Sequence, residues 1–596
     1  MVGQKTGLLV TMFHEDTKII AENPRPNART PTEEKRMYRI WSCWLGVCTF
    51  GVLCAFRVLG LVALQLASDN SPQPKAVAPA EVHRWGVFET SLTATRDYAE
   101  PLWDVRVEVT FVAPSGKKHV REAFWDGGRI WRVRFSPDEI GPWQWSTQAQ
   151  PEDPGLHRHQ GEFRVREYTG DNPLYRHGPL RVAASGTYIE HADGTPFFWL
   201  ADTAWNGVLK SQPADWQRYL ATRKKQGFSA IQFVSTQWRG GNKTIKEHVF
   251  SREGKLRVYP QVLARMDAKL AQCNAHHLVA VPVLLWALTP SDPGEALSEN
   301  EARRLCEYLI ARWGAYQVVW LLGGDGHYRN TQRWQRLGRQ LFTAQPHDRL
   351  VSLHPSGQNW IWDRFGNEAW INFLGYQSGH GDNEAHLRWL VEGPPAKQWR
   401  RQPPKPIINL EPNYEAHPSY HSRQLFQPYH VRRAAYWSLL ITPPAGVTYG
   451  HHNIWPWLDQ PGPVEGHERL GQAGAWTAGL EAPGAQAMGI LKTFFLSGPW
   501  TELRPANQAL VEQPGEKAPE RFVAVSATPK RTWLVAYLPQ GGTIRLRREF
   551  LPAKPSSQWF DPRTGKKQPA NAELHDKEAR FVAPDDQDWV LDIRSE

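Results

Sequence analysis

Eight short apolar runs, each followed by a polar or helical stretch, constrain the fold of this chain most. Segments of helical character such as DWQRYLATRKKQG (215–227) and NEARRLCEYLIARWG (300–314) lie between them. Buried strands that alternate with crossover helices over roughly 300 residues predict a (β/α)8 TIM barrel over 168–487. The runs are FFWLAD (197–202), FSAIQFVST (228–236), LVAVPVLLW (278–286), VVWLLGGD (318–325), RLVSLHPSG (349–357), INFLGYQSG (371–379), KPIINLEPN (405–413) and AGVTYGHHN (445–453).

Two regions of a different pattern flank the predicted barrel. Residues 81–167 contain alternating runs such as WDVRVEVTFVAP (103–114), separated by turns, and this spacing predicts an Ig-like β-sandwich. Residues 488–596 return to short β runs, such as TWLVAYLP (532–539), and predict a second β-sandwich at the C-terminal end. The chain is therefore predicted to be multidomain.

The first 80 residues predict export of this body. After a tail at 1–39, residues 40–67 consist of two largely apolar runs separated by Arg57, and 68–80 form a Pro/Ala-rich linker. Basic residues precede the apolar segment, so the positive-inside rule predicts a cytoplasmic N-terminus and a body outside the cytoplasm. Two interpretations remain open: an uncleaved membrane anchor, or a signal peptide that starts at Met37 and leaves a secreted or periplasmic body.

Composition narrows the classes of function. The net charge of +10 is scattered without a basic block, so nucleic acid is not predicted as a partner. The 29 tryptophans favour an aromatic-lined cleft, and flat rings of this kind pack against the C–H face of a sugar. The chain has no HExxH, G-x-S-x-G, Walker A or GxGxxG motif and no Cys/His cluster, so neither a metal nor a cofactor is predicted. Cys273 and Cys306 are predicted to be free thiols, with one disulfide between them as the alternative.

Two carboxylates end strands of the predicted barrel. Asp325 ends the fourth run and Glu411 lies near the end of the seventh, and the carboxyl ends of barrel strands carry the chemistry. Glycoside hydrolysis needs such a pair, one acid to protonate the leaving oxygen and one carboxylate to attack the anomeric carbon or to activate water. The alternatives are that Asp325 caps the following helix and that Glu411 is a buried salt-bridge partner.

Other polar and aromatic residues at the strand ends are candidates for binding an oligo- or polysaccharide substrate. Asp202 has the alternative of capping the first barrel helix. The candidates are Asp202, Trp205, Asn206, Trp238, Trp286, His354, Gln377, Tyr449 and Trp455.

Four motifs, WLADTAWN, WLLGGDGHY, INLEPNYE and TYGHHNIWPW, resemble those of the apiosidase-like glycoside hydrolases, a (β/α)8 family. The segment from HRWGVFETSL to WQWST resembles a β-sandwich domain that often precedes this barrel, and the final domain resembles a module labelled as collagen-binding. The resemblance covers roughly residues 81–596 and implies Asp325 as acid/base and Glu411 as nucleophile. Related retaining barrels usually have Asn-Glu where Gly324-Asp325 stands here, and Asp is one methylene shorter than Glu.

These observations predict an exported retaining glycoside hydrolase that acts on plant or microbial polysaccharide. The alternative is a catalytically inactive carbohydrate- or matrix-binding protein on the same fold. The sequence specifies neither the sugar and linkage, nor endo or exo action, nor the oligomeric state.

Overall fold

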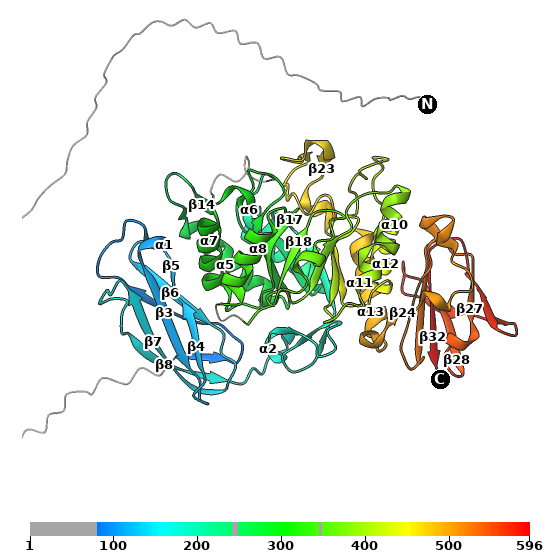
Figure 1. The fold of residues 1–596 in the computed structure, drawn as a ribbon, viewed down its shortest axis with the longest axis horizontal. Coiled ribbons are helices and arrows are strands. Elements are labelled where there is room, and N and C mark those ends of the chain that lie inside the picture. Colours follow the sequence, from blue (N-terminus) through cyan, green and yellow to red (C-terminus); the bar gives the residue numbers. More distant parts are fainter. Residues whose placement is uncertain (1–79, 241–247, 345–347) are drawn as a thin grey trace, which may run out of the picture. The chain divides into compact units, whose positions relative to one another are not determined.

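The computed structural model describes residues 80–240, 248–344 and 348–596 (Figure 1). The predicted tail and apolar segment, and nearly all of the predicted linker, lie outside these ranges. Within them, no helix combines the length and the apolar composition needed to cross a membrane.

The first described region is a pair of β-sheets. Strands β1, β8, β7, β3 and β4 form one sheet and β2, β6 and β5 the other, and all their pairings are antiparallel except β1 with β8. Inward residues such as Val107, Val109 and Phe111 alternate with outward polar ones and build a shared core. The elements are β1 (Ala80–His83), β2 (Phe88–Thr93), α1 (Pro101–Asp104), β3 (Arg106–Val112), β4 (Lys118–Glu122), β5 (Phe124–Trp125), β6 (Ile130–Phe135), β7 (Gly141–Gln150) and β8 (Gln160–Arg166).

The eight predicted apolar runs are the eight parallel strands of a nearly closed barrel. Their order is β18-β17-β16-β13-β12-β21-β20-β19. The remaining seam is bridged by the Asn372 N–H, which donates to the Val351 carbonyl at 2.9 Å, and by the Ser352 hydroxyl, which donates to the Phe373 carbonyl at 2.7 Å. The strands are β12 (Trp199–Thr203), β13 (Ala230–Val234), β16 (Val279–Trp286), β17 (Trp320–Gly326), β18 (Val351–Pro355), β19 (Leu374–Gln377), β20 (Ile407–Glu411) and β21 (Gly446–Tyr449).

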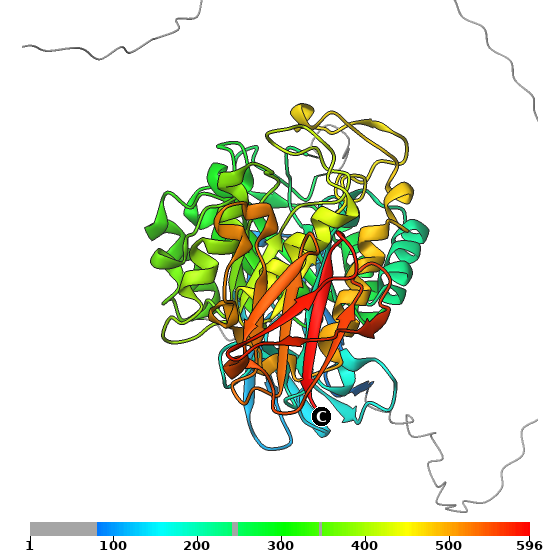
Figure 2. The same ribbon diagram turned by 90° about the vertical axis from the view of Figure 1, so that its right-hand side faces the viewer.

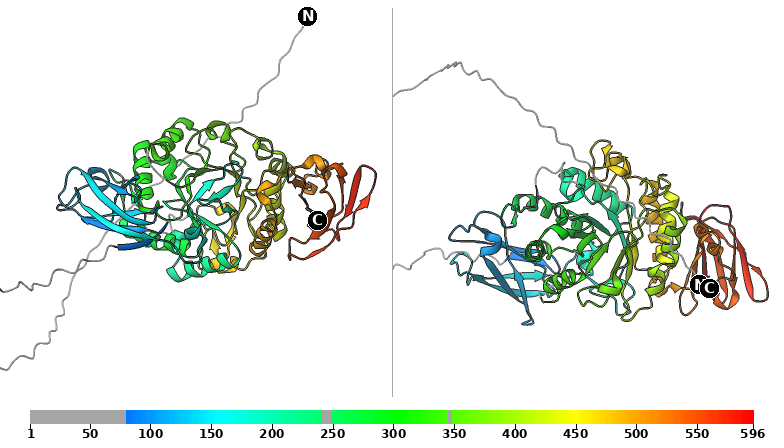
Figure 3. Two further views of the ribbon diagram at one scale, coloured as in Figure 1. Left: turned by 90° about the horizontal axis from the view of Figure 1, so that it is seen from below. Right: turned by 45° about the horizontal axis from the view of Figure 1, so that its top comes forward.

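Helices follow the strands and cover the outside of the barrel (Figure 3). Outward residues such as Leu200 and Ile231 pack against these helices, whereas inward residues such as Trp199 and Val281 fill the barrel interior. Cys273 and Cys306 are both buried and free, as predicted. The helices are α3 (Gly207–Lys210), α4 (Pro213–Lys225), α5 (Pro260–Ala275), α6 (Pro293–Ala296), α7 (Glu299–Trp313), α8 (Thr331–Phe342), α9 (Trp362–Phe365), α10 (Glu384–Glu392), α11 (Pro394–Gln398), α12 (Pro428–Leu440) and α13 (Pro483–Leu496).

Short elements connect the sandwich to the barrel and decorate the barrel loops. They are α2 (Pro173–Arg176), β9 (Leu180–Val182), β10 (Ile189–His191), β11 (Pro196–Phe197), β14 (Phe250–Ser251), β15 (Arg257–Val258), β22 (Gly462–Pro463) and β23 (Gln472–Ala473).

The C-terminal region is a six-stranded sheet, β24-β25-β26-β32-β28-β29, and a three-stranded sheet, β27-β31-β30 (Figure 2). The six-stranded sheet is tied to helix α12: Arg432 forms an ion pair with Asp588 at 2.8 Å, and the Trp437 indole donates to the Phe522 carbonyl at 2.9 Å. The strands are β24 (Arg504–Pro505), β25 (Ala524–Ala527), β26 (Trp533–Leu538), β27 (Thr543–Arg547), β28 (Pro555–Phe560), β29 (Lys567–Pro569), β30 (Glu573–Leu574), β31 (Glu578–Val582) and β32 (Trp589–Ser595).

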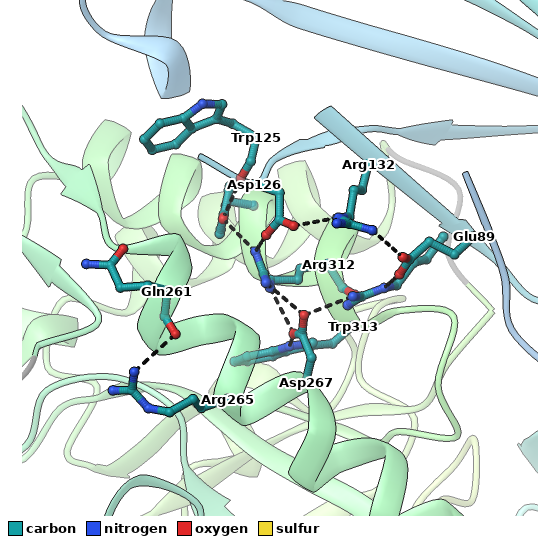
Figure 4. Close-up of polar contacts among 11 residues, drawn as sticks. Glu89, Trp125, Asp126, Arg132, Gln261, Arg265, Asp267, Arg312 and Trp313 are labelled. Carbon is teal, nitrogen blue, oxygen red and sulfur yellow. Dashed lines mark hydrogen bonds and ion pairs between the residues drawn. The ribbon is translucent and has the colours of Figure 1, made fainter. Parts of the chain in front are cut away.

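A closed ring of alternating charges joins the N-terminal sandwich to the barrel (Figure 4). The sandwich contributes two carboxylates and two guanidiniums, and the barrel contributes Asp267 from α5 and Arg312 from α7. Each neighbouring pair lies 2.5–2.9 Å apart, and the Trp313 indole also donates to Asp267 at 2.7 Å. In order around the ring, the members are Arg312, Asp126, Arg132, Glu89, Arg134 and Asp267.

Asp267→Ala is expected to lower the free energy of unfolding by about 3–5 kcal/mol, because it leaves the buried Arg312 and Arg134 without their shared counter-charge. Urea denaturation of the variant measures this loss. The matched control is Glu299→Ala, which removes a carboxylate paired with Arg336 on a solvent-exposed face and should change stability little. Equal losses in the two variants would show that the ring is no stronger than a surface ion pair.

Candidate active site

Asp325 and Glu411 lie at the carboxyl ends of β17 and β20. Glu411 is buried, and Asp325 is partly exposed. The negative charge of Glu411 affects the ionisation of Asp325, so the two carboxylates interact electrostatically. The barrel therefore holds both at the end where (β/α)8 proteins carry their chemistry.

Close packing around the GGDG segment requires a glycine at position 324. A Cβ on Gly324 would lie 2.5 Å from Val283 and 2.6 Å from the Trp286 ring, so only glycine fits there. Asp325 has a φ of +50°, which is uncommon for a residue with a side chain, and the register of β17 with β18 shifts on both sides of the neighbouring Gly324. Strain of this kind is typical of functional sites. Helix α8 is capped by Asn330, whose side chain accepts from the Arg333 N–H at 3.2 Å, so Asp325 is not its cap.

Side chains that carry N–H groups surround Glu411. Its Oε1 accepts hydrogen bonds from Gln377 Nε2 at 2.8 Å and His380 Nε2 at 2.9 Å, and His354 Nε2 lies 3.4 Å from Oε2. Among the described residues, no lysine or arginine forms an ion pair with Glu411, which disfavours the salt-bridge alternative. Burial alone would raise the pKa of Glu411, but the hydrogen bonds of His380 and Tyr414 and the field of His354 outweigh it, so the pKa is lowered.

The pKa of Asp325 shifts in the opposite direction. Burial raises it first, the negative charge of Glu411 raises it further, and Arg239 opposes both without cancelling them. Asp325 therefore holds a proton under conditions in which Glu411 is ionised. Two carboxylates whose pKa values are pushed apart are suited to act as a proton donor and a nucleophile or base.

Four of the predicted tryptophans form one cluster at this end of the barrel. Trp286 contacts Trp205 and Trp238 at ring-centroid distances of 5.3 and 5.1 Å, and Trp238 contacts Trp455 at 5.9 Å. The buried indole N–H groups of Trp238, Trp286 and Trp455 have no hydrogen-bond partner among the described residues. A buried donor without a partner costs about 1–3 kcal/mol, so the cluster is suited to a ligand that supplies oxygen acceptors.

His354 lies between this cluster and Glu411. It is fully buried, stands in register with Gly324 and packs edge-on against Trp205 at 5.3 Å. Burial lowers its pKa, although the charge of Glu411 opposes this shift. Its Nε2 is thus placed beside the Glu411 carboxylate.

The structure corrects the predictions for Asp202 and Tyr449. The fully buried Asp202 carboxylate accepts from Tyr219 at 2.6 Å, from Arg223 at 2.5 Å and from the Thr203 N–H at 2.8 Å, so it neither caps α3 nor has capacity left for a sugar. The Tyr449 hydroxyl donates to Glu415 at 2.6 Å. Both side chains belong to a buried network outside the barrel interior.

Asn206 also has a structural partner set. It is fully buried, and its Nδ2 donates to the carbonyls of Gly240 at 2.7 Å and Pro456 at 3.2 Å. These bonds fix the loops that carry Trp238 and Trp455. Asn206 thus supports the tryptophan cluster through its Nδ2, while its buried Oδ1 has no hydrogen-bond partner among the described residues.

Residues absent from the predicted set complete the surroundings of the carboxylates. Tyr414 and His380 act on Glu411, and Arg239 acts on Asp325 while contacting His467 at 3.0 Å. The sequence offered one signal, the spacing of LEPNYE, because a residue three positions after the strand end can fold back over it. Arg239 and His467 lie in loops whose positions no periodicity reveals.

The cavities differ in their relation to this site. A cavity of about 660 Å³ lies between the sandwich and α7, by the amino-terminal end of β17, and is lined by charged residues that mostly pair with one another. A smaller one, of about 210 Å³, lies beside Trp238 and Asp292 at the opposite, carboxyl end of the strands. Only the smaller cavity adjoins the residues described above.

The barrel and its carboxylate pair define a protein of the glycoside hydrolase class, and solved structures share the fold. A protein described as "Glycoside hydrolase" is 24% identical, with a TM-score of 0.59, covering 72% of this chain and 99% of that one. A glycoside hydrolase family 5 protein from Bacteroides vulgatus is 24% identical, with a TM-score of 0.60 and coverages of 71% and 95%. A protein from the same organism, described as "a putative glycoside hydrolase", is 18% identical, with a TM-score of 0.66 and coverages of 87% and 100%.

The chain belongs to the apiosidase-like family, because the family described as "Apiosidase-like, catalytic domain" matches residues 183–502, more than half of its length. A domain of unknown function, DUF5060, matches residues 81–150, and the "Putative collagen-binding domain of a collagenase" matches residues 505–593. No curated protein matches the chain. The resemblance stated from the motifs is confirmed.

Proposed function

We propose that this chain is a retaining glycoside hydrolase in which Glu411 is the nucleophile and Asp325 the general acid/base. In the first step a Glu411 oxygen bonds to the anomeric carbon, the glycosidic C–O bond breaks, and the leaving oxygen takes the Asp325 proton. In the second step water attacks the anomeric carbon, gives a proton to Asp325 and releases Glu411 from its ester.

The observation that carries this proposal is the placement of two carboxylates at the carboxyl ends of β17 and β20, with pKa values shifted in opposite directions. When the ester forms, Glu411 loses the charge that raises the pKa of Asp325. Asp325, which has given its proton to the leaving oxygen, then has a lower pKa, stays ionised and can accept a proton from the attacking water. One pair thus has the protonation states that both steps need.

The stereochemistry of the product tests the retaining mechanism. We expect ¹H NMR of a reaction on an aryl glycoside to show first the product anomer with the configuration of the substrate. A first product with the inverted configuration would show that the enzyme is inverting. Glu411 would then be a general base that activates water and not a nucleophile.

The substrate class that we propose is plant or microbial polysaccharide, with apiosidase-like specificity as the first candidate. The tryptophan cluster with free N–H donors supports a sugar ligand. A panel of aryl glycosides and pectic oligosaccharides identifies the sugar and the linkage. Binding without turnover anywhere on the panel would favour the alternative, an inactive carbohydrate-binding protein.

We also propose that the body works outside the cytoplasm. The support is the apolar segment 40–67 with basic residues before it. Cell fractionation should recover the full-length protein with membranes, and external protease should release an active body. Recovery of all the protein as a soluble species that begins after Ala67 would show that the segment is cleaved.

A further inference from the structure

Tyr420 lies in the connection between β20 and α12 and is adjacent to the nucleophile. Its backbone N–H donates to the His380 carbonyl at 2.8 Å, and the His380 ring in turn binds Glu411 at 2.9 Å. The residue is nevertheless 51% exposed, although nearly every other aromatic residue near the carboxylates is buried. A large aromatic side chain is therefore presented to solvent beside the reacting groups.

The loop that carries Tyr420 is held in one shape. The Ser419 N–H donates to the Gln424 carbonyl at 2.9 Å, and Pro418 pairs with Leu425 in an antiparallel bridge. The Ser422 hydroxyl contacts both Ser419, at 2.9 Å, and the Asp382 carboxylate in the loop after β19. Because these contacts tie the two loops together, the loop that carries the ring loses little conformational entropy when a ligand binds.

The ring itself has two near-perpendicular aromatic neighbours. His380 and His417 meet it at centroid distances of 5.4 and 5.9 Å and interplanar angles of 82° and 77°. Near-perpendicular contacts of this kind fix the orientation of a ring, and half of the residue stays exposed to solvent. Burial of part of the residue and the charges of Glu411 and Asp325 raise the pKa of the phenol, which agrees with its place within the field of both carboxylates.

We propose that Tyr420 is the stacking platform of a sugar-binding subsite, whose ligand is a pyranose or furanose ring of the substrate that presents its C–H face. Trp205 and Trp286 pack around His354 at the other oxygen of Glu411, so aromatic surfaces flank the nucleophile at both oxygens. This inference rests on the proposed function, since it places a ring of the substrate of that site. Tyr420 positions the substrate and takes no part in bond breaking.

Three variants test the platform. Tyr420→Ala should raise KM about tenfold, or about 1.4 kcal/mol, on the panel glycosides that the wild type cleaves, with little change in kcat or in the pH profile. Tyr420→Trp keeps a flat ring and should restore KM. The matched control is Leu425→Ala, in the same loop and 53% exposed, which should leave KM unchanged. Equal KM values for Tyr420→Ala and Leu425→Ala, or a loss confined to kcat, would overturn the platform.

Calorimetry with the same aryl glycosides and pectic oligosaccharides separates this inference from the proposed function. It is run on the full chain carrying Glu411→Gln, with and without Tyr420→Ala. Binding that weakens about tenfold when Tyr420 is removed supports the subsite, even if the wild type cleaves no member of the panel and the proposed hydrolase fails. Binding that does not depend on Tyr420, or no binding at all, overturns the subsite whatever the enzyme cleaves.

Discussion

Replacing Glu411 by alanine is expected to abolish turnover on every glycoside that the intact chain cleaves, with kcat falling by roughly 10⁴-fold or more. The carboxylate forms the covalent bond to the anomeric carbon, and no other acid among the described residues shares its set of donors. Steady-state kinetics on the best panel substrate measures the loss.

Two control variants test whether misfolding causes the loss of activity. Glu411→Gln keeps the shape and the contacts with Gln377 and His380, so its thermal unfolding should match the wild type while its activity is lost. Glu384→Gln, on an exposed helix face, is the matched control and should keep full activity. Near-wild-type activity of Glu411→Ala on any cleaved substrate would remove Glu411 from the mechanism.

Asp325→Ala should lower kcat by about 10²- to 10⁴-fold on substrates with poor leaving groups. Activated aryl glycosides should lose far less in the first step, since a good leaving group needs little protonation. Added azide should restore turnover with such substrates, because it attacks the glycosyl–enzyme without a general base. The measurements are kcat/KM across a series of aryl leaving groups and the appearance of a glycosyl azide.

The pH profile gives an independent check on Asp325. Its raised pKa should set the alkaline limb of activity, since the acid form is lost as the pH rises through it. The lowered pKa of Glu411 should set the acid limb, where protonation removes the nucleophile. Asp325→Ala should therefore lose the alkaline limb and keep the acid one. An unchanged profile, with equal losses for all leaving groups, would assign the acid to another residue.

The barrel could be predicted because its strands are buried on both sides. Runs such as LVAVPVLLW have the length and the β-branched composition of parallel strands, and each is followed by a helix-forming stretch. The same property hides the orientation of the side chains. In β12, Trp199 and Ala201 point inward and Leu200 outward, so Asp202 shares the outward side with Leu200. The sequence of an all-apolar strand does not show which of its residues face inward, and the prediction for Asp202 is wrong for this reason.

Tyr449 was misplaced for the same reason. It lies two residues after Val447, and both belong to the cluster between the strands and the helices. Asp325 and Glu411 stand at the strand ends, where the position along the strand was sufficient to find them. Tyr414, Arg239 and Tyr420 lie in loops, and their positions depend on contacts between segments far apart in the chain, such as that of Ser422 with Asp382.

The ring of alternating charges bears on how modules of this kind can be exchanged. The family match begins at residue 183, after all four ring members that the sandwich supplies. In a chimera that joined this barrel to the sandwich of another protein, that sandwich would need two carboxylates and two guanidiniums in matching places. Any other sandwich would leave Asp267 and Arg312 beside mismatched or missing charges. The two domains can therefore pack together only when their charges match around the ring, and this requirement limits which sandwich domains can be joined to this barrel.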